Sequence, residues 1–417
     1  MQRIVFRGFR IVDAERDFFG TLAVEDGRIE KIIDGTSRHP FAQVIIEGRH
    51  FPKSAVLMPA FIDLHAHFRE PGFPQKETLE SASLAAVAGG FATAVCMANT
   101  SPAIDSLEKA LALKARSDAL SLLDLYPAIS LTKNMEGAEL SGIRELENVI
   151  GKNGKPQILM FSEDGKDVAD DGLFLAAMAE AKRLGVPVSC HCDLGGAEDA
   201  AVRRVIELGK KAGCRLHIAH VSTKETVETI RAAKKDRAGD ESFSLTCEAA
   251  PHHIGATRQD AERMGSESFG RVNPPLASEA DRRAVVAAAL DGTIDAIATD
   301  HAPHSRADKE AGAPGFVGLE TAFAACLANF SEREDLRRIS ALASANPAQI
   351  LGLRDRGKIA EGLRADFVIA DTQTPWKVDP AQFKSRGRCT PFEGKELRGK
   401  ILMTTSLGRV VFQEGRI

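Results

Sequence analysis

Short apolar runs alternate with amphipathic stretches through the middle of the chain. Runs with the length and composition of buried strands lie at residues 60–67, 91–99, 122–130, 157–162, 186–192, 215–222, 243–250 and 295–300. Stretches with helical periodicity separate several of them, at 77–88, 173–184 and 225–235. This βα alternation over eight strands predicts an α/β fold with a parallel sheet, at this number a (β/α)8 TIM-like barrel. A doubly wound open sheet is the alternative, because counting strands does not prove closure.

The two ends of the chain have a different pattern, with polar and apolar residues in alternation. It runs through residues 4–12 and 22–33, where Asp26-Gly27 is a strong hairpin turn signal. The same character returns at 365–371 and 400–417. We therefore expect a small β-sandwich domain built from both termini, residues 1–55 plus 350–417, beside a barrel domain at 56–349.

Composition narrows the class of protein. The 417 residues are 44% hydrophobic and 27% charged, with a formal charge of −4 and a pI near 6.3. This balance gives no electrostatic reason to expect a nucleic acid or an anionic membrane as partner. No apolar run is long enough to span a bilayer, and the N-terminus lacks the apolar region of a signal peptide. The seven cysteines are therefore expected as reduced thiols in a cytoplasmic protein.

Polar side chains, most of them able to bind metal, gather where the predicted strands end. They are His65 and His67 with Arg69 after the first strand, Asn99 after the second, Glu163 and Asp164 after the fourth, His191 after the fifth, His220 after the sixth, and Asp300, His301 and His304 after the eighth. In barrels of this type the functional residues lie at the carboxyl ends of the strands. His65 and His67 are two residues apart, so on a strand they share a face. Imidazoles with carboxylates suit Zn²⁺ with an open position for water, and we expect a metal site at this mouth.

Other polar residues of the region are expected to be structural. His217 is three residues before His220, so strand alternation predicts that it faces the other way and packs against a helix. Cys190 and Cys192 are expected as small core residues. The pair at 252–253 is expected to make hydrogen bonds within a loop.

A series of motifs resembles the dihydroorotases of the amidohydrolase superfamily, in their type I bacterial branch. The motifs are D-L-H-A-H-F-R-E-P-G (63–72), K-E-T (76–78), M-A-N-T-S-P (97–102), F-S-E-D-G (161–165), H-I-A-H-V-S-T (217–223), E-A-A-P-H-H (248–253), N-P-P-L (273–276), A-T-D-H-A-P-H (298–304) and G-F-V-G-L-E-T (315–321). Their order and spacing follow the family nearly from end to end. Two departures are Ala98, where the family usually has proline, and Ala277, where it usually has arginine; both put substrate affinity in question more than reaction type.

The resemblance implies a role for particular residues. Implied metal ligands are His65, His67, Asp164, His191, His220 and Asp300, holding one or two Zn²⁺ ions. By comparison with F-T-D-D-G, Asp164 rather than Glu163 is expected to bridge the metals, where many cyclic amidohydrolases use a carboxylated lysine. Asp300 is implied as the catalytic group that moves the proton between water and the ring nitrogen. Arg69, Asn99, Asn273 and His304 are implied to bind substrate, with Arg69 on its unreacted carboxylate.

Three hypotheses about function follow. The first is a dihydroorotase that interconverts N-carbamoyl-L-aspartate and L-dihydroorotate in pyrimidine (UMP) biosynthesis. The second is another cyclic amidohydrolase, similar to hydantoinases or allantoinases, which usually supply the lysine that is missing here. The third is a dihydroorotase-like subunit that only scaffolds aspartate transcarbamoylase; retention of all six implied ligands argues against it. A homodimer, and an active enzyme that also associates with aspartate transcarbamoylase, are both compatible with the resemblance.

Overall fold

All eight strands expected in the middle of the chain are present in the computed structural model, which describes residues 3–35, 42–151, 154, 156–192, 197–236, 242–330 and 336–415. The strands are β6 (Phe61–Ala66), β7 (Phe91–Cys96), β8 (Asp124–Pro127), β9 (Phe161–Ser162), β10 (Val188–Cys190), β11 (Arg215–Ile218), β12 (Ser244–Ala249) and β13 (Ala296–Ile297). Each lies within its predicted run and is shorter than it, because the residues at the carboxyl end of several runs leave the strand to form the site. Residues 416–417 of the predicted C-terminal strand lie outside the described residues.

The eight strands close into a barrel. β6, β7 and β8 form one parallel group, and β9 to β13 form another. Single parallel bridges join the groups on both sides, Ile129 with Phe161 and Ala66 with His301. On the second side the backbone N–H of His67 also donates to the carbonyl of His301 at 2.8 Å. The (β/α)8 fold is therefore confirmed, and the open sheet is excluded.

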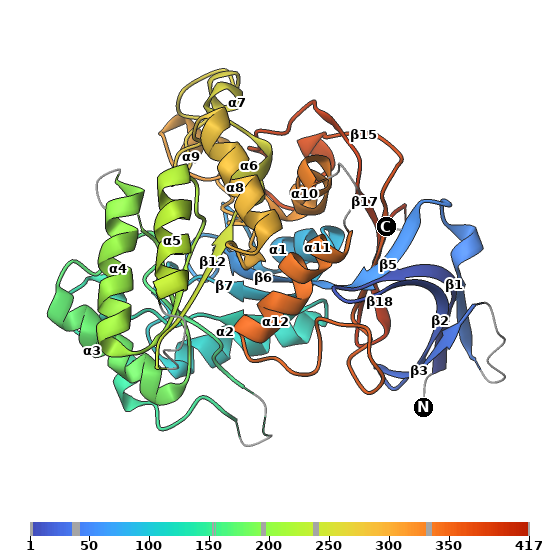
Figure 1. The fold of residues 1–417 in the computed structure, drawn as a ribbon, viewed down its shortest axis with the longest axis horizontal. Helices are drawn as coiled ribbons and strands as arrows, with labels where there is room; N and C mark the ends of the chain where they lie inside the picture. The colour runs from blue at the N-terminus through green and yellow to red at the C-terminus, as the bar shows by residue number, and fades with distance from the viewer. Residues whose placement is uncertain are drawn as a thin grey trace.

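Helices cover the outside of the barrel, and α3, α4 and α5 lie side by side along one flank (Figure 1). The helices are α1 (Leu79–Ala88), α2 (Leu107–Leu120), α3 (Asp171–Leu184), α4 (Glu198–Ala212), α5 (Lys224–Asp236), α6 (Pro251–Gly255), α7 (Arg258–Glu262), α8 (Glu279–Asp291), α9 (Arg306–Glu310), α10 (Ala322–Phe330), α11 (Leu336–Ser340) and α12 (Asn346–Ile350). Among the described residues, none of the helices has the length and apolar character that crossing a membrane requires.

The strands present one face to the helices and the other to the barrel interior, as period-two alternation requires. On β7, Ala94 and Cys96 belong to the large core shared with the helices, whereas Val95 belongs to a separate interior cluster. The interior is apolar on the side of β6, β7, β8 and β13. On the side of β11 and β12 the interior positions are polar, with His217 and Glu248 buried there. The barrel therefore has a polar wall beneath one half of its mouth.

The two ends of the chain form one further sheet, to the right of the barrel in Figure 1, in the order β18-β17-β14-β5-β1-β2-β3 with β4 also on β1. Its strands are β1 (Arg3–Val12), β2 (Asp17–Glu25), β3 (Arg28–Asp34), β4 (Val44–Glu47), β5 (Ala55–Pro59), β14 (Phe367–Asp371), β17 (Lys400–Ser406) and β18 (Arg409–Gln413); β15 (Trp376–Lys377) and β16 (Glu396–Leu397) pair separately. A bulge at Gly8, where φ is 70°, shifts the register so that Phe6 and Phe9 both face the same apolar core. A terminal β domain is thus present, and the exact boundaries given above stay predictions.

A buried ionic cluster fastens the segment that returns to this sheet against the bottom of the barrel. One oxygen of Asp124, at the start of β8, accepts hydrogen bonds from Arg356 at 2.8 Å and Arg364 at 3.0 Å. Its other oxygen accepts from Lys114 at 3.0 Å. The guanidinium of Arg356 also donates to Thr93 on β7 at 2.8 Å. These cations hold the pKa of Asp124 below its ordinary value, although burial alone would raise it.

Replacing Asp124 with asparagine should destabilise the chain, because two buried guanidinium groups would lose the carboxylate that they share, and each would keep one other partner, Asp355 for Arg356 and Asp366 for Arg364. We expect the free energy of unfolding to fall by about 3 kcal/mol, the range found when one partner of a buried ion pair is removed. Urea denaturation followed by circular dichroism measures this. Asp118→Asn is the matched control, since Asp118 contacts the same Lys114 at 3.2 Å but is 54% exposed. Equal stability of the two variants would contradict the anchoring role of the cluster.

Candidate functional site

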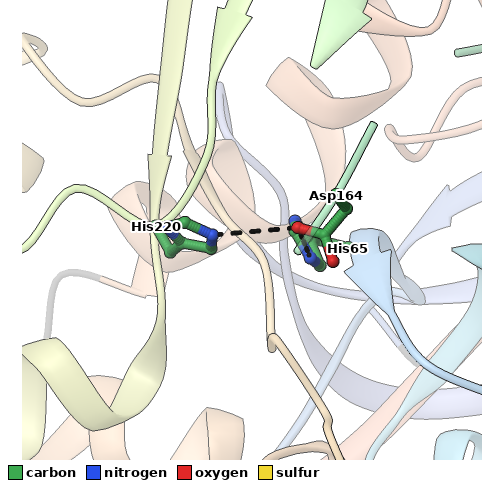
Figure 2. A group of neighbouring side chains, drawn as sticks. All are labelled: His65, Asp164 and His220. Atoms are coloured by element: carbon green, nitrogen blue, oxygen red, sulfur yellow. Dashed lines mark ion pairs between the residues drawn. The ribbon is translucent and has the colours of Figure 1, made fainter. Parts of the chain in front are cut away.

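The carboxylate of Asp164 lies among four histidines from three different strand ends. Its Oδ1 is 3.1 Å from Nε2 of His65, 3.6 Å from Nδ1 of His191 and 3.9 Å from Nε2 of His220. Its Oδ2 is 3.5 Å from Nε2 of His67. Figure 2 shows the ring of His220 facing the carboxylate across a gap, with His65 close beside it. Burial would raise the pKa of Asp164, but the surrounding imidazoles hold it well below its ordinary value.

Asp300 completes the cluster from the end of β13. Its Oδ1 lies 3.3 Å from Nε2 of His67 and 3.8 Å from Nε2 of His65. Two groups of side chains therefore have the spacing of metal sites: His65, Asp164 and His220 form one, and His65, His67 and Asp300 form the other, with ligand atoms within 4.8 Å of one another in each. All six residues predicted as ligands come together here, because His191 is hydrogen-bonded to His220 at 2.8 Å.

The donor set fits a metal ion. Four buried atoms of the cluster lack a hydrogen-bond partner of suitable geometry among the described residues: Nδ1 and Nε2 of His65, Oδ1 of Asp164 and Nδ1 of His220. Leaving buried polar atoms unpaired is costly, and a cation beside Nε2 of His65 and Oδ1 of Asp164, which lie 3.1 Å apart, would satisfy that pair. Imidazole nitrogens combined with carboxylate oxygens are the donors that Zn²⁺ accepts.

Glu163, next to Asp164 in the chain, points elsewhere. One of its oxygens accepts from the backbone N–H of Leu131 at 2.9 Å and of Thr132 at 3.0 Å, and the other accepts from the Thr132 hydroxyl. Its charge is therefore committed to the loop that follows β8. Only Asp164 of the two acidic neighbours faces the histidines.

Asn99 lies against two members of the cluster. Its Oδ1 is 2.9 Å from Nδ1 of His67, and its amide nitrogen donates to Oδ2 of Asp164 at 3.2 Å. If His67 donates from Nδ1, its Nε2 faces Asp164 and Asp300 as an acceptor, the state that binds metal. In this structure Asn99 therefore orients two candidate ligands, a role beyond the substrate contact that the resemblance implied.

The backbone is strained where it delivers these side chains. Arg69, His220 and Asp300 have φ of 60°, 37° and 44°, in the left-handed region that residues with a Cβ rarely adopt. Each lies two or three residues after the end of a strand, so the chain turns sharply as it leaves the barrel. Such conformations gather at functional sites, where the surrounding structure holds them.

Arg69 and His304 form a second group at the mouth. Arg69 is 9% exposed, its Nε donates to the carbonyl of Pro303 at 3.1 Å, and a terminal nitrogen lies 3.2 Å from Nε2 of His304. Lys76 lies 3.3 Å from Nδ1 of His304, so that nitrogen must be the acceptor and Nε2 carries the proton. Burial and the neighbouring cations lower the pKa of His304 to about 3, and the ring is neutral. The group offers N–H donors and positive charge to an anion.

Asn273 stands apart from these contacts. It is half-buried, it immediately precedes Pro274, and no hydrogen bond of its side chain is found within the part of the chain that the structure describes. The following segment reaches the site indirectly, because the carbonyl of Pro274 accepts from Nε2 of His253 at 3.1 Å. The structure brings the other nine predicted site residues into two contiguous groups.

The expected orientation of His217 is wrong. Its ring faces the barrel interior, with Nδ1 2.8 Å from the hydroxyl of Thr246 and Nε2 3.0 Å from Glu248. The other oxygen of Glu248 lies 3.3 Å from Nδ1 of His65, so His217 supports the cluster through Glu248. Alternation failed here because β11 ends at Ile218, and the period of two does not extend to His220.

Three further polar residues near the cluster were not predicted to belong to it. Glu248 could have been found, because it shares a strand face with Thr246. Asp63 accepts hydrogen bonds from the backbone N–H of His65 at 3.2 Å and of Thr299 at 2.9 Å. His252 was expected to be a loop residue, yet its Nε2 lies 3.9 Å from Oδ2 of Asp300. Nothing in the sequence pattern distinguishes His252 from its neighbour at 253.

Comparisons with known proteins agree with this architecture. A model described as the amidohydrolase family matches residues 56–411. A protein named dihydroorotase from Clostridium botulinum (strain Eklund 17B / Type B) is 37% identical, with 99% of this chain and 100% of the relative covered. Another protein of that name, from Anaeromyxobacter dehalogenans (strain 2CP-C), is 36% identical, with coverage of 100% and 99%.

Among solved structures, the L-hydantoinase (dihydropyrimidinase) from Arthrobacter aurescens superposes with a TM-score of 0.85. The alignment covers 100% of this chain and 97% of that one at 24% identity, a likeness that shows the shared fold. The sequence matches extend over whole chains and are stronger. The chain therefore belongs to the amidohydrolase family and, within it, to the dihydroorotase family.

Proposed function

We propose that the chain catalyses the reversible cyclisation of N-carbamoyl-L-aspartate to L-dihydroorotate, with His65, His67, Asp164, His191, His220 and Asp300 holding Zn²⁺. One observation carries the proposal: a buried cluster of metal-competent side chains lies beside an arginine that can bind a carboxylate. Membership in the dihydroorotase family supports the same reaction. The proposed reaction gives a role to both groups at the mouth of the barrel, since the cluster around Asp164 would hold Zn²⁺ and Arg69 would bind the carboxylate of the substrate.

The donor set supports one or two zinc ions. His65 belongs to both groups with metal-site spacing, and Asp164 has an oxygen toward histidines on either side. When bound, Zn²⁺ would lower the pKa of a coordinated water to about 7 and polarise the amide carbonyl. Asn99 and Glu248 hold the ligands His67 and His65 from behind, as hydrogen-bonded supports of metal ligands usually do.

Asp300 is the group that moves the proton in this proposal. Hydrogen bonding to His67 and the charge of nearby imidazoles keep the pKa of Asp300 below its ordinary value, against the effect of burial. The carboxylate is therefore ionised at neutral pH. In ring opening it accepts a proton from the attacking water and delivers it to the departing ring nitrogen. In ring closure it removes a proton from the carbamoyl nitrogen.

Arg69 is the feature that favours dihydroorotate over other cyclic amides. Dihydroorotate carries a carboxylate that the reaction leaves intact, and a simple hydantoin has none. A guanidinium can bind a carboxylate through two parallel hydrogen bonds. Arg69 has no carboxylate partner in a salt bridge within the described ranges, and the ring of His304 beside it is neutral, with its Nε2 proton directed at the carbonyl of Pro314.

The proposal also covers the location of the protein in the cell and the proteins with which it associates. All seven cysteines are unpaired, which supports the cytoplasmic location expected from the sequence. The homodimer and the association with aspartate transcarbamoylase stay predictions of the resemblance.

The reaction can be tested with the purified chain after zinc reconstitution. We expect hydrolysis of L-dihydroorotate and, under the same conditions, at least about a hundredfold lower kcat/KM for unsubstituted hydantoin, because Arg69 has no carboxylate to bind. Ultraviolet absorbance follows ring opening of both. Equal turnover of the two rings would contradict the proposed substrate. Turnover of neither alone, with activity restored by aspartate transcarbamoylase, would favour a partner-dependent subunit.

Replacing His65 and His67 with alanine should remove metal and activity together, since both candidate sites lose ligands. We expect zinc content to fall below roughly a tenth of the wild-type value, measured by mass spectrometry of the metal after dialysis. His50→Ala is the control, because His50 is exposed and remote from the barrel mouth. A double variant that kept the wild-type zinc content would rule out these residues as ligands.

Arg69→Met should raise the KM for dihydroorotate by about ten- to a hundredfold, because a charge-assisted hydrogen bond to the substrate is lost. Zinc content should not change, which separates this effect from damage to the metal site. Arg203→Met is the control: Arg203 lies on α4 with its side chain 60% exposed. An unchanged KM would mean that the carboxylate is bound elsewhere.

A further inference from the structure

Lys309, on the short helix α9, is 1% exposed. Its ammonium donates to three backbone carbonyls, those of Arg271 at 2.9 Å, Ala313 at 2.9 Å and Gly315 at 3.1 Å. It also lies over the ring of Phe316, 5.4 Å from the centroid. An ammonium has three N–H donors, so this one is fully satisfied.

The arrangement is costly for a residue that only fills space. Within the described ranges no carboxylate forms a salt bridge with Lys309, and burial lowers its pKa. Taking an unpaired charge out of water is unfavourable, and the hydrogen bonds must offset this. An apolar side chain would fill the same volume without that cost. The role of the ammonium therefore lies in the chain segments that its hydrogen bonds connect.

The three carbonyls belong to two segments that carry proposed substrate-binding residues. Arg271 is two residues before Asn273. Ala313 and Gly315 flank Pro314, whose carbonyl lies 2.9 Å from Nε2 of His304. Lys309 thus ties the segment of Asn273 to the loop that faces His304.

The backbone allows little freedom at this junction. The carbonyl of Arg271 also accepts from the N–H of Gly315 at 3.0 Å, and Ala302 donates to the carbonyl of Phe316 at 2.7 Å. Gly315 has φ of 140°, and a Cβ there would lie 2.6 Å from the carbonyl oxygen of Ala302. The loop is therefore pressed against the end of the barrel. The helix α9 (Arg306–Glu310) begins in the same segment, capped by Ser305 and Asp308.

We propose that Lys309 is a positioning residue for substrate binding: its ammonium fixes the Asn273 segment and the Pro314 loop in the register that presents Asn273 and His304 to the substrate. The inference rests on the substrate-binding roles proposed above. Its structural part, the tie between the two segments, does not depend on those roles and can be measured separately.

Lys309→Met keeps the length of the side chain and removes its three hydrogen bonds. We expect the KM for dihydroorotate to rise about tenfold or more, with kcat within about threefold and zinc content unchanged, because the loss concerns orientation and not the metal cluster. Lys309→Gln, which retains two N–H donors, should fall between Met and wild type. The matched control is Arg306→Met on the same helix; Arg306 is 85% exposed, pairs with Glu310, and its replacement should leave KM unchanged.

A double-mutant cycle separates positioning from general destabilisation. In an Asn273→Ala/His304→Ala background, Lys309→Met should raise KM less than about threefold, because both groups that it presents are already absent. The same tenfold rise in both backgrounds, an unchanged KM, or a fall in kcat equal to the rise in KM would overturn the proposal.

Hydrogen exchange tests the tie itself without substrate. In Lys309→Met the amide of Gly315 should exchange faster than in wild type, and in Arg306→Met it should not. Unchanged exchange at Gly315 in Lys309→Met overturns the structural part, even if the variant binds substrate poorly. If instead exchange rises while the wild-type chain fails to open dihydroorotate, the proposed function fails and the tie stands.

Discussion

The organisation of this molecule depends on one buried carboxylate, that of Asp164, held among the imidazoles of four histidines. A lone carboxylate in a barrel interior would be neutralised or excluded, since desolvation raises its pKa. Here the imidazoles reverse that shift, and the anion is stable. The arrangement needs side chains from the ends of β6, β9, β10 and the segment after β11 to meet at one point, and only a closed barrel brings those ends together.

Around this centre, each polar group is supported by another. Glu248 holds His65 and is itself held by His217, while Asn99 bonds both His67 and Asp164. The contacts of His217 and Glu248 lie on the polar wall beneath the mouth, opposite the apolar side of the barrel interior. A site whose ligands are already fixed loses little conformational entropy when a metal or substrate binds, because the cost of ordering those side chains is met during folding.

Arg69 and Lys309 are two buried cations near the mouth of the barrel, and the hydrogen-bond acceptors around each one determine its role. Arg69 has its guanidinium next to a neutral histidine and keeps capacity for an anion. All three N–H donors of Lys309 are hydrogen-bonded to backbone carbonyls, so its ammonium holds chain segments together and has no donor left for a ligand. Residue type alone would assign both to the same class. Their different roles follow from which acceptors the fold places around them.

The sequence by itself determined the barrel and the edge at which its polar residues collect, since strand alternation and residue spacing are local properties of the chain. It also predicted that Asp164 and not Glu163 faces the histidines, through a resemblance. Only the tertiary structure decided the directions of His217 and His252, the double engagement of Asn99 and the use of Lys309. Period-two alternation ends where a strand ends, at Ile218 for example, and beyond that point side-chain directions depend on backbone turns such as the left-handed residues His220 and Asp300. Those turns are set by contacts between segments far apart in the chain, which no local pattern records.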